Sequence, residues 1–88
     1  MRFSAFEWDE RNIAHIARHN VAPEEVEEAC DNNPYILKGR GGTYLTYSQT
    51  DTGRFLLVIA KYKGKETVRV IAARDMTERE RKLCKDRR

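Results

Sequence analysis

Residues 66–81 read ETVRVIAARDMTERER, and this stretch decides the fold. Valine, isoleucine and alanine dominate residues 66–73, which predicts a strand inside a sheet. After a short linker, Thr77 with Glu80 three residues later is a complete capping box for a terminal helix. A purely structural strand does not need the four arginines around it, at positions 69, 74, 79 and 81. The stretch therefore predicts a sheet edged with arginines that binds phosphate groups.

Outward from this stretch, the chain reads as one α+β domain covering residues 1–88. In chain order we expect a short strand at 3–8, helices at 10–19 and 23–31, strands at 35–38, 43–50, 54–62 and 66–73, and a terminal helix from 77. Because strands and helices come in separate runs, the helices should pack against an antiparallel sheet of about four strands.

The ends of the helices carry their own signals. Asp9 can cap the first helix with its carboxylate, and Asn20 suits the left-handed conformation that ends many helices. Pro23 fits the first position of the second helix, where Ala22 is a poor cap and Glu25 supplies half of a capping box. These signals predict two short helices separated at residues 20–22.

Charge is divided unevenly along the chain. Residues 1–33 carry 3 Lys or Arg against 8 Asp or Glu, whereas residues 61–88 carry 11 against 5. A basic concentration of this kind is typical of phosphate binding, but also of an interface with an acidic protein or of a solvated surface. With no signal peptide and no apolar run of membrane length, we expect a cytoplasmic protein without a membrane partner, in which Cys30 and Cys84 are reduced thiols.

Two histidines, His15 and His19, have the i and i+4 spacing that allows a shared metal ion. The residue after His15 is Ile16 rather than a glutamate that could activate water, and no third ligand is evident, so we expect no metal. A structural role at the helix end and a place in a polar active or interface site both remain open.

The basic residues near the chain's second half have two readings each. Lys61, Lys63 and Lys65 with Tyr62 could stack a base and neutralise phosphates, or form a charged hairpin that protects a sheet edge. Strand alternation places Arg69 on the face of Ile71 and Ala73, opposite Val68 and Val70. There Arg69 either pairs with Glu66 or a helix carboxylate, or faces a site, where Arg74 and Arg81 can converge.

These residues resemble the BrnT branch of the RelE/ParE superfamily, the toxins of type II toxin–antitoxin pairs. The likeness spans most of the chain and is most specific in its two end blocks. It rests on Trp8-Asp9-Glu10 with Asn12, 15–19, Val21, Pro23 and 25–28, then on Gly53-Arg54, Arg69, 73–77 and Glu80-Arg81. Two residues depart from the family pattern, since Asn20 replaces the usual Gly and Cys84 stands where relatives commonly carry Tyr.

The resemblance implies a RelE/ParE-like fold and a metal-independent endoribonuclease, an mRNA interferase that inhibits translation and needs no cofactor. When a 2′-hydroxyl attacks the neighbouring phosphate, some groups must move protons and cations must stabilise the charged phosphorane. Arginines suit the second task because a guanidinium holds two phosphate oxygens at once. The expected catalytic residues are His15, His19, Arg69, Arg74, Glu80 and Arg81, and the expected RNA-binding residues are Arg54, Lys61, Tyr62, Lys63 and Lys65.

The same resemblance implies partners and leaves alternatives open. A cognate antitoxin, a DNA-binding protein encoded nearby, would cover the basic surface and exclude RNA. The assembly would be a homodimer or a toxin–antitoxin heterotetramer. One alternative is a non-enzymatic poison of another target such as gyrase. The other is a nucleic-acid-binding or regulatory module that has lost catalysis, for which Cys84 is the reason.

Overall fold

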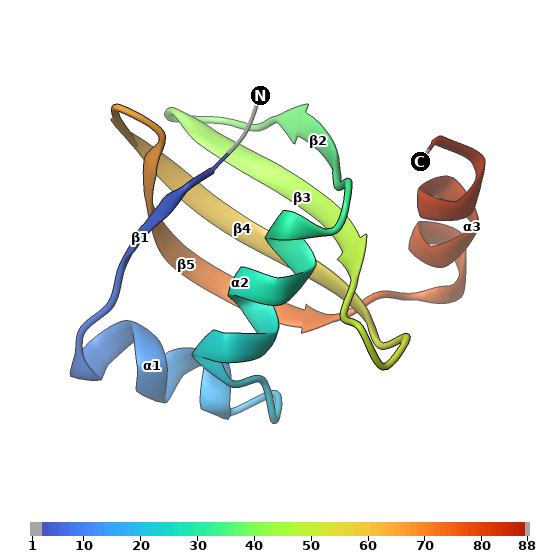
Figure 1. Cartoon of the computed structure of the whole chain (residues 1–88), viewed down its shortest axis with the longest axis horizontal. Coiled ribbons are helices and arrows are strands. Elements are labelled where there is room, and N and C mark those ends of the chain that lie inside the picture. The colour runs from blue at the N-terminus through green and yellow to red at the C-terminus, as the bar shows by residue number, and fades with distance from the viewer. Residues whose placement is uncertain (1–2, 88) are drawn as a thin grey trace.

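The structure is a computed structural model that describes residues 3–87, in which the chain forms three helices and five strands (Figure 1). All the predicted elements are present, with ends that agree to within a few residues. In chain order they are β1 (Ala5–Glu7), α1 (Glu10–Ala17), α2 (Pro23–Asp31), β2 (Tyr35–Lys38), β3 (Thr43–Gln49), β4 (Phe55–Gly64), β5 (Thr67–Asp75) and α3 (Glu78–Arg87). The predicted α+β class is confirmed.

The five strands form one sheet in the order β1-β5-β4-β3-β2. β2 to β5 are antiparallel neighbours, as expected, but β1 joins the edge of β5 in parallel, so the sheet is mixed. The expectation of a purely antiparallel sheet was wrong at this strand. Two helices and three strands separate β1 from β5, so no tight turn dictates the relative direction of the pair.

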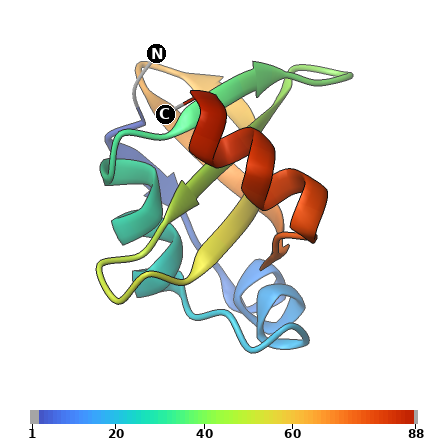
Figure 2. The same cartoon turned by 90° about the vertical axis from the view of Figure 1, so that its right-hand side faces the viewer.

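Helices cover both faces of this sheet. α1 and α2 pack on one face, where Ile16, Val26, Leu56, Val58 and Val68 are among the buried core residues. α3 lies on the opposite face, over a smaller cluster that contains Tyr47, Leu57, Met76 and Cys84 (Figure 2). β4 therefore contributes side chains to both cores, which explains its nearly continuous apolar sequence.

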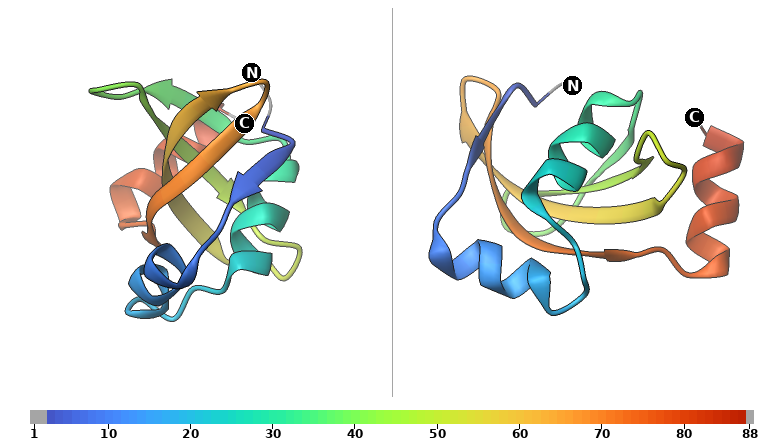
Figure 3. Two further views of the ribbon diagram at one scale, coloured as in Figure 1. Left: turned by 90° about the vertical axis from the view of Figure 1, so that its left-hand side faces the viewer. Right: turned by 60° about the horizontal axis from the view of Figure 1, so that its bottom comes forward.

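Asn12 and Asp9 fix α1 against the sheet. The buried Asn12 side chain donates from Nδ2 to the carbonyl oxygens of Glu7, at 2.8 Å, and Val70, at 3.2 Å, and its Oδ1 accepts from the Asp9 amide at 2.8 Å. Asp9 caps the helix as predicted, because its Oδ1 accepts from the amides of Arg11 and Asn12. These bonds tie α1 to β1 and to the middle of β5, as Figure 3 shows from two sides.

A β-bulge interrupts β5 beside α1. Ile59 pairs with Ala72 and Ala60 with Val70, so Ile71 has no partner in the register of β4 and β5. The extra residue reverses the alternation, and Ala73 lies in the helix-side core with Val70 rather than on the face of Arg69. The expected placement of Ala73 was wrong for this reason.

The local signals at the other helix ends are confirmed. Asn20 has a φ of 57° in the turn after α1, and Glu25 accepts the Ala22 amide at the start of α2, which has no side-chain cap. At α3, Thr77 and Glu80 form the reciprocal hydrogen bonds of a capping box. None of the helices described within residues 3–87 is long and apolar enough to cross a membrane.

Candidate functional site

An open groove of about 490 Å³ lies between α1 and β5. β1 pairs with β5 only as far as Arg69, and α1 lies beside the residues that follow. The groove thus joins the helix that carries the histidines to the strand that carries the arginines. We call it the α1–β5 groove, and its lining residues are Arg11, Asn12, His15, Arg18, Arg69, Val70 and Ile71.

One face of α1 supplies the polar wall of the groove. Arg11, His15 and Arg18 have the i, i+4 and i+7 spacing that places side chains in one row along a helix. All three are exposed, and within residues 3–87 none of them has a hydrogen-bond or ion-pair partner. Two guanidinium groups and an imidazole therefore face solvent together, available to an anionic ligand.

Arg69 closes one end of the groove, and its guanidinium is held by carboxylates. It donates to both oxygens of Asp9, at 2.9 and 3.2 Å, and to Glu7 at 3.2 Å. Pairing was one of the two readings from sequence, but the partners are these residues rather than Glu66. Since 27% of the Arg69 side chain remains exposed, a ligand in the groove can still reach it.

The Asp9–Arg69 pair makes folding sensitive to acid. Its hydrogen bonds with Arg69, together with those from the helix amides, lower the pKa of Asp9 from 3.8 to about 2. Between these two values an unfolded chain binds a proton at Asp9 and the folded protein does not, so lowering the pH favours unfolding. We expect the melting temperature to fall as the pH drops below about 4, with a shallower fall in Asp9→Asn, which keeps the helix cap.

Thermal melts across this pH range test the effect. Asp86→Asn, which removes an exposed carboxylate of α3, is the matched control and should leave the steepness of the curve as in the parent protein. Equal curves for Asp9→Asn and the parent protein would show that the Asp9–Arg69 pair does not contribute to acid sensitivity.

Arg74 and Glu80 form a second ion pair, at the junction of β5 and α3. Nη1 and Nη2 of Arg74 donate to the two carboxylate oxygens of Glu80, at 2.8 and 2.9 Å, and Glu80 also accepts the Thr77 amide. These contacts lower the pKa of Glu80, and burial raises the pKa of nearby Tyr47. At neutral pH Glu80 is thus a carboxylate that fixes Arg74 and caps α3.

Arg81 does not join Arg74 but lies on the other side of α3. Its guanidinium carbon is 4.6 Å from the ring centroid of Phe55, and the Lys85 ammonium is 5.5 Å from the same ring. Both cations border a shallow depression with Glu78 and Lys82. The three arginines expected to form one phosphate-binding set are therefore distributed over two regions, the α1–β5 groove and the α3 side of the sheet.

Arg54 makes internal contacts that link four parts of the fold. Nε donates to Asp75 at 2.7 Å, Nη1 to Glu25 at 3.0 Å and to the Asn20 carbonyl at 2.7 Å, and Nη2 to the His19 carbonyl at 3.1 Å. The guanidinium holds the turn after α1 against α2 and the end of β5. These contacts raise the pKa of Arg54 and lower that of Asp75. His19 belongs to this turn and does not line the groove.

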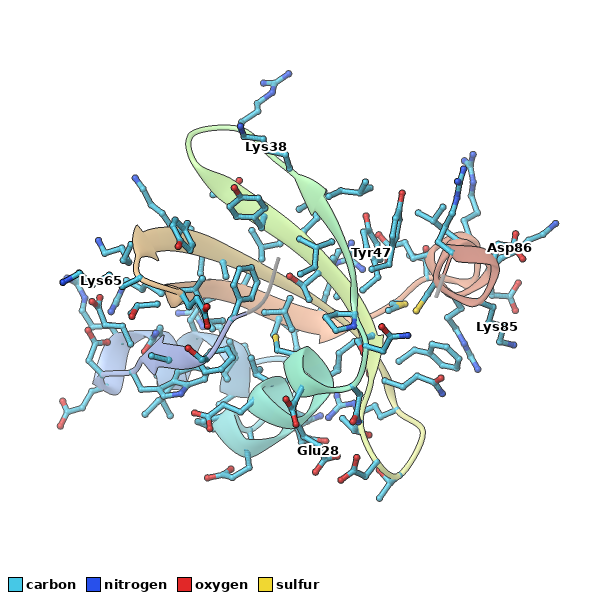
Figure 4. All side chains as sticks on the ribbon, turned by 45° about the horizontal axis from the view of Figure 1, so that its top comes forward. Glu28, Lys38, Tyr47, Lys65, Lys85 and Asp86 are labelled. Atoms are coloured by element: carbon cyan, nitrogen blue, oxygen red, sulfur yellow. The ribbon has the colours of Figure 1, made fainter. Side chains whose placement is uncertain are left out.

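The hairpin between β4 and β5 separates its lysines from its tyrosine. Lys61, Lys63 and Lys65 are exposed, whereas Tyr62 packs against the helix-side core and stacks edge-on with Tyr44. The Tyr62 hydroxyl accepts the amide of Glu66. Figure 4 shows Lys65 at this hairpin and Lys85 on α3, at opposite sides of the molecule. The hairpin therefore offers cations without an accessible aromatic face.

Sequence reasoning missed three residues of the groove. Arg11 and Arg18 were assigned to the solvent side of the first helix, although their i and i+7 spacing around His15 was available as a signal. Ile71 was assigned to strand alternation, because a bulge leaves no mark in residue type.

Comparisons with known proteins return no relative. No protein-family model matches the chain, and no curated protein is significantly similar to it. Within residues 3–87 no group of three or more His, Cys, Asp or Glu side chains is arranged to hold a metal ion. The function must therefore be argued from the groove and its charges.

Proposed function

We propose that the chain is the toxin of a type II toxin–antitoxin pair and cleaves RNA without a metal ion. The α1–β5 groove carries this proposal, because it places His15 between two unpaired arginines and beside a third. Guanidinium groups bind phosphate oxygens, and an imidazole can transfer a proton near neutral pH. These are the two kinds of group that RNA transesterification needs.

The reaction proposed is the attack of a ribose 2′-oxygen on the adjacent phosphorus. His15 accepts the proton of the 2′-hydroxyl while the new P–O bond forms, and the P–O5′ bond breaks to leave a 2′,3′-cyclic phosphate. The leaving 5′-oxygen takes a proton from solvent, to which the groove is open. Arg11, Arg18 and the exposed part of Arg69 stabilise the additional negative charge of the phosphorane.

The direct test incubates single-stranded RNA with the purified protein in excess EDTA. Cleavage to products with 2′,3′-cyclic phosphate ends supports the proposal. Binding without cleavage favours the second candidate, a nucleic-acid-binding module, which the carboxylate pairing of Arg69 and Arg74 makes plausible. Growth arrest with neither cleavage nor RNA binding would point to a poison of another target.

Replacing both Arg11 and Arg18 with alanine is expected to weaken RNA binding and to reduce its dependence on salt. Each lost phosphate contact on a single strand lowers the slope of log K against log[salt] by about 0.7, so the double variant should lose about 1.4. Fluorescence anisotropy with labelled single-stranded RNA at several salt concentrations measures the slope.

The hairpin offers a matched control for this double variant. Lys63→Ala with Lys65→Ala removes the same amount of charge from exposed positions away from the groove. If the lysine pair changes the slope and the arginine pair does not, RNA binds at the hairpin and the groove is not the site.

We further propose that an antitoxin covers the groove and excludes RNA from it. The toxin surface there is basic, so an acidic segment of the partner would bind by charge complementarity. A gene for a small DNA-binding protein next to that of the toxin, and copurification of the two products, would support this pairing.

A further inference from the structure

Ile71 is a large apolar side chain that the fold leaves exposed. It is 43% exposed, and Ile13, at 39%, is the other large apolar side chain exposed to this degree within residues 3–87. The two differ in origin, because Ile13 is on a helix face whereas Ile71 occupies the β-bulge and lacks a partner on β4. Bulges often change the direction of a side chain beside a functional site.

The surroundings of Ile71 combine apolar and cationic groups. It lies in the α1–β5 groove with Arg69 on its own strand and Arg11, His15 and Arg18 on the facing helix. A nucleotide has the complementary composition, since its phosphate is anionic and the faces of its base and sugar are largely apolar. An isolated exposed isoleucine needs no explanation, but one inside a cationic groove is a natural contact for a base.

We propose that Ile71 packs against the base of one unpaired nucleotide whose phosphates are held by the arginines of the groove. This assignment rests on the proposed function and adds the residue that contacts the base. In a duplex the faces of the bases are stacked and inaccessible, so the contact requires a base that is unstacked from its neighbours. The groove should therefore bind single-stranded RNA in preference to the same sequence in a duplex.

The test compares Ile71→Ser with Ile13→Ser, the matched control. Anisotropy with labelled single-stranded RNA should show affinity about fivefold lower for Ile71→Ser, because part of an apolar contact is lost, and unchanged affinity for Ile13→Ser. The salt slope should stay that of the parent protein in both variants, since neither removes a charge. Ile71→Phe, which offers a flat surface for stacking, should bind at least as tightly as the parent.

The outcomes separate this inference from the proposed function. If the parent protein neither binds nor cleaves RNA, the proposed function fails. If the parent binds RNA and Ile71→Ser binds as well as Ile13→Ser, the inference about Ile71 is overturned while the function stands. Loss of a copurifying protein at unchanged RNA affinity would assign Ile71 to a protein interface instead, and would also overturn it. Melting curves confirm that both serine variants are folded.

Discussion

Arg54→Ala is expected to lower the free energy of unfolding by about 3 kcal/mol, more than other substitutions of a single charged residue. Its guanidinium links β4 to two carboxylates and two backbone carbonyls, and hydrogen bonds with charged partners contribute about 1.5–3 kcal/mol each without being additive. For a domain of this size the melting temperature should fall by roughly 15 °C. Urea titration and thermal melts measure the two quantities.

Two further variants sharpen the Arg54 experiment. Arg54→Lys keeps the charge but not the planar fork of donors, so its stability should lie between those of the alanine variant and the parent. Arg40→Ala removes an exposed arginine in a turn and should change stability by less than about 0.5 kcal/mol. An Arg54→Ala protein as stable as Arg40→Ala would mean that these contacts do not hold the fold together.

His15→Ala is expected to reduce RNA cleavage by about 10²–10⁴-fold, the usual contribution of a general base. RNA affinity should change little, because Arg11, Arg18 and Arg69 remain in the groove. The side chain is exposed and unpaired within the described residues, so the melting temperature should also be preserved. Single-turnover cleavage and anisotropy on the same preparation separate the two effects.

His19→Ala is the matched control for His15. It removes the second imidazole of the same segment, at a position outside the groove, and should leave most of the cleavage rate intact. If His19→Ala abolishes cleavage and His15→Ala does not, proton transfer occurs near Arg54 and Asp75 rather than in the α1–β5 groove.

The features predicted correctly from the sequence depend on neighbours in the chain. The cap at Asp9, the left-handed Asn20 and the capping box of Thr77 and Glu80 involve residues at most a few positions apart. Strand and helix periods likewise act within one element, so the order of elements and the α+β class followed from them.

The features that the sequence did not predict depend on distant contacts. The parallel pairing of β1 with β5, the carboxylates that hold Arg69 and the partners of Arg54 all join segments far apart along the chain. Residue type alone cannot distinguish an arginine that faces a ligand from one that faces a carboxylate. The groove could be only half predicted, because its helix wall follows from spacing whereas its strand wall depends on the bulge at Ile71.

The pairing of β1 with β5 also determines when the groove can exist during protein synthesis. Ala5 pairs with Thr67 and Glu7 with Arg69, so the first strand made can only find its place after the last strand has been made. The α1 wall, which Asn12 anchors to Val70, must wait for the same strand. A nascent chain therefore has no assembled groove until nearly all of it has left the ribosome, and any activity located there is confined to finished molecules.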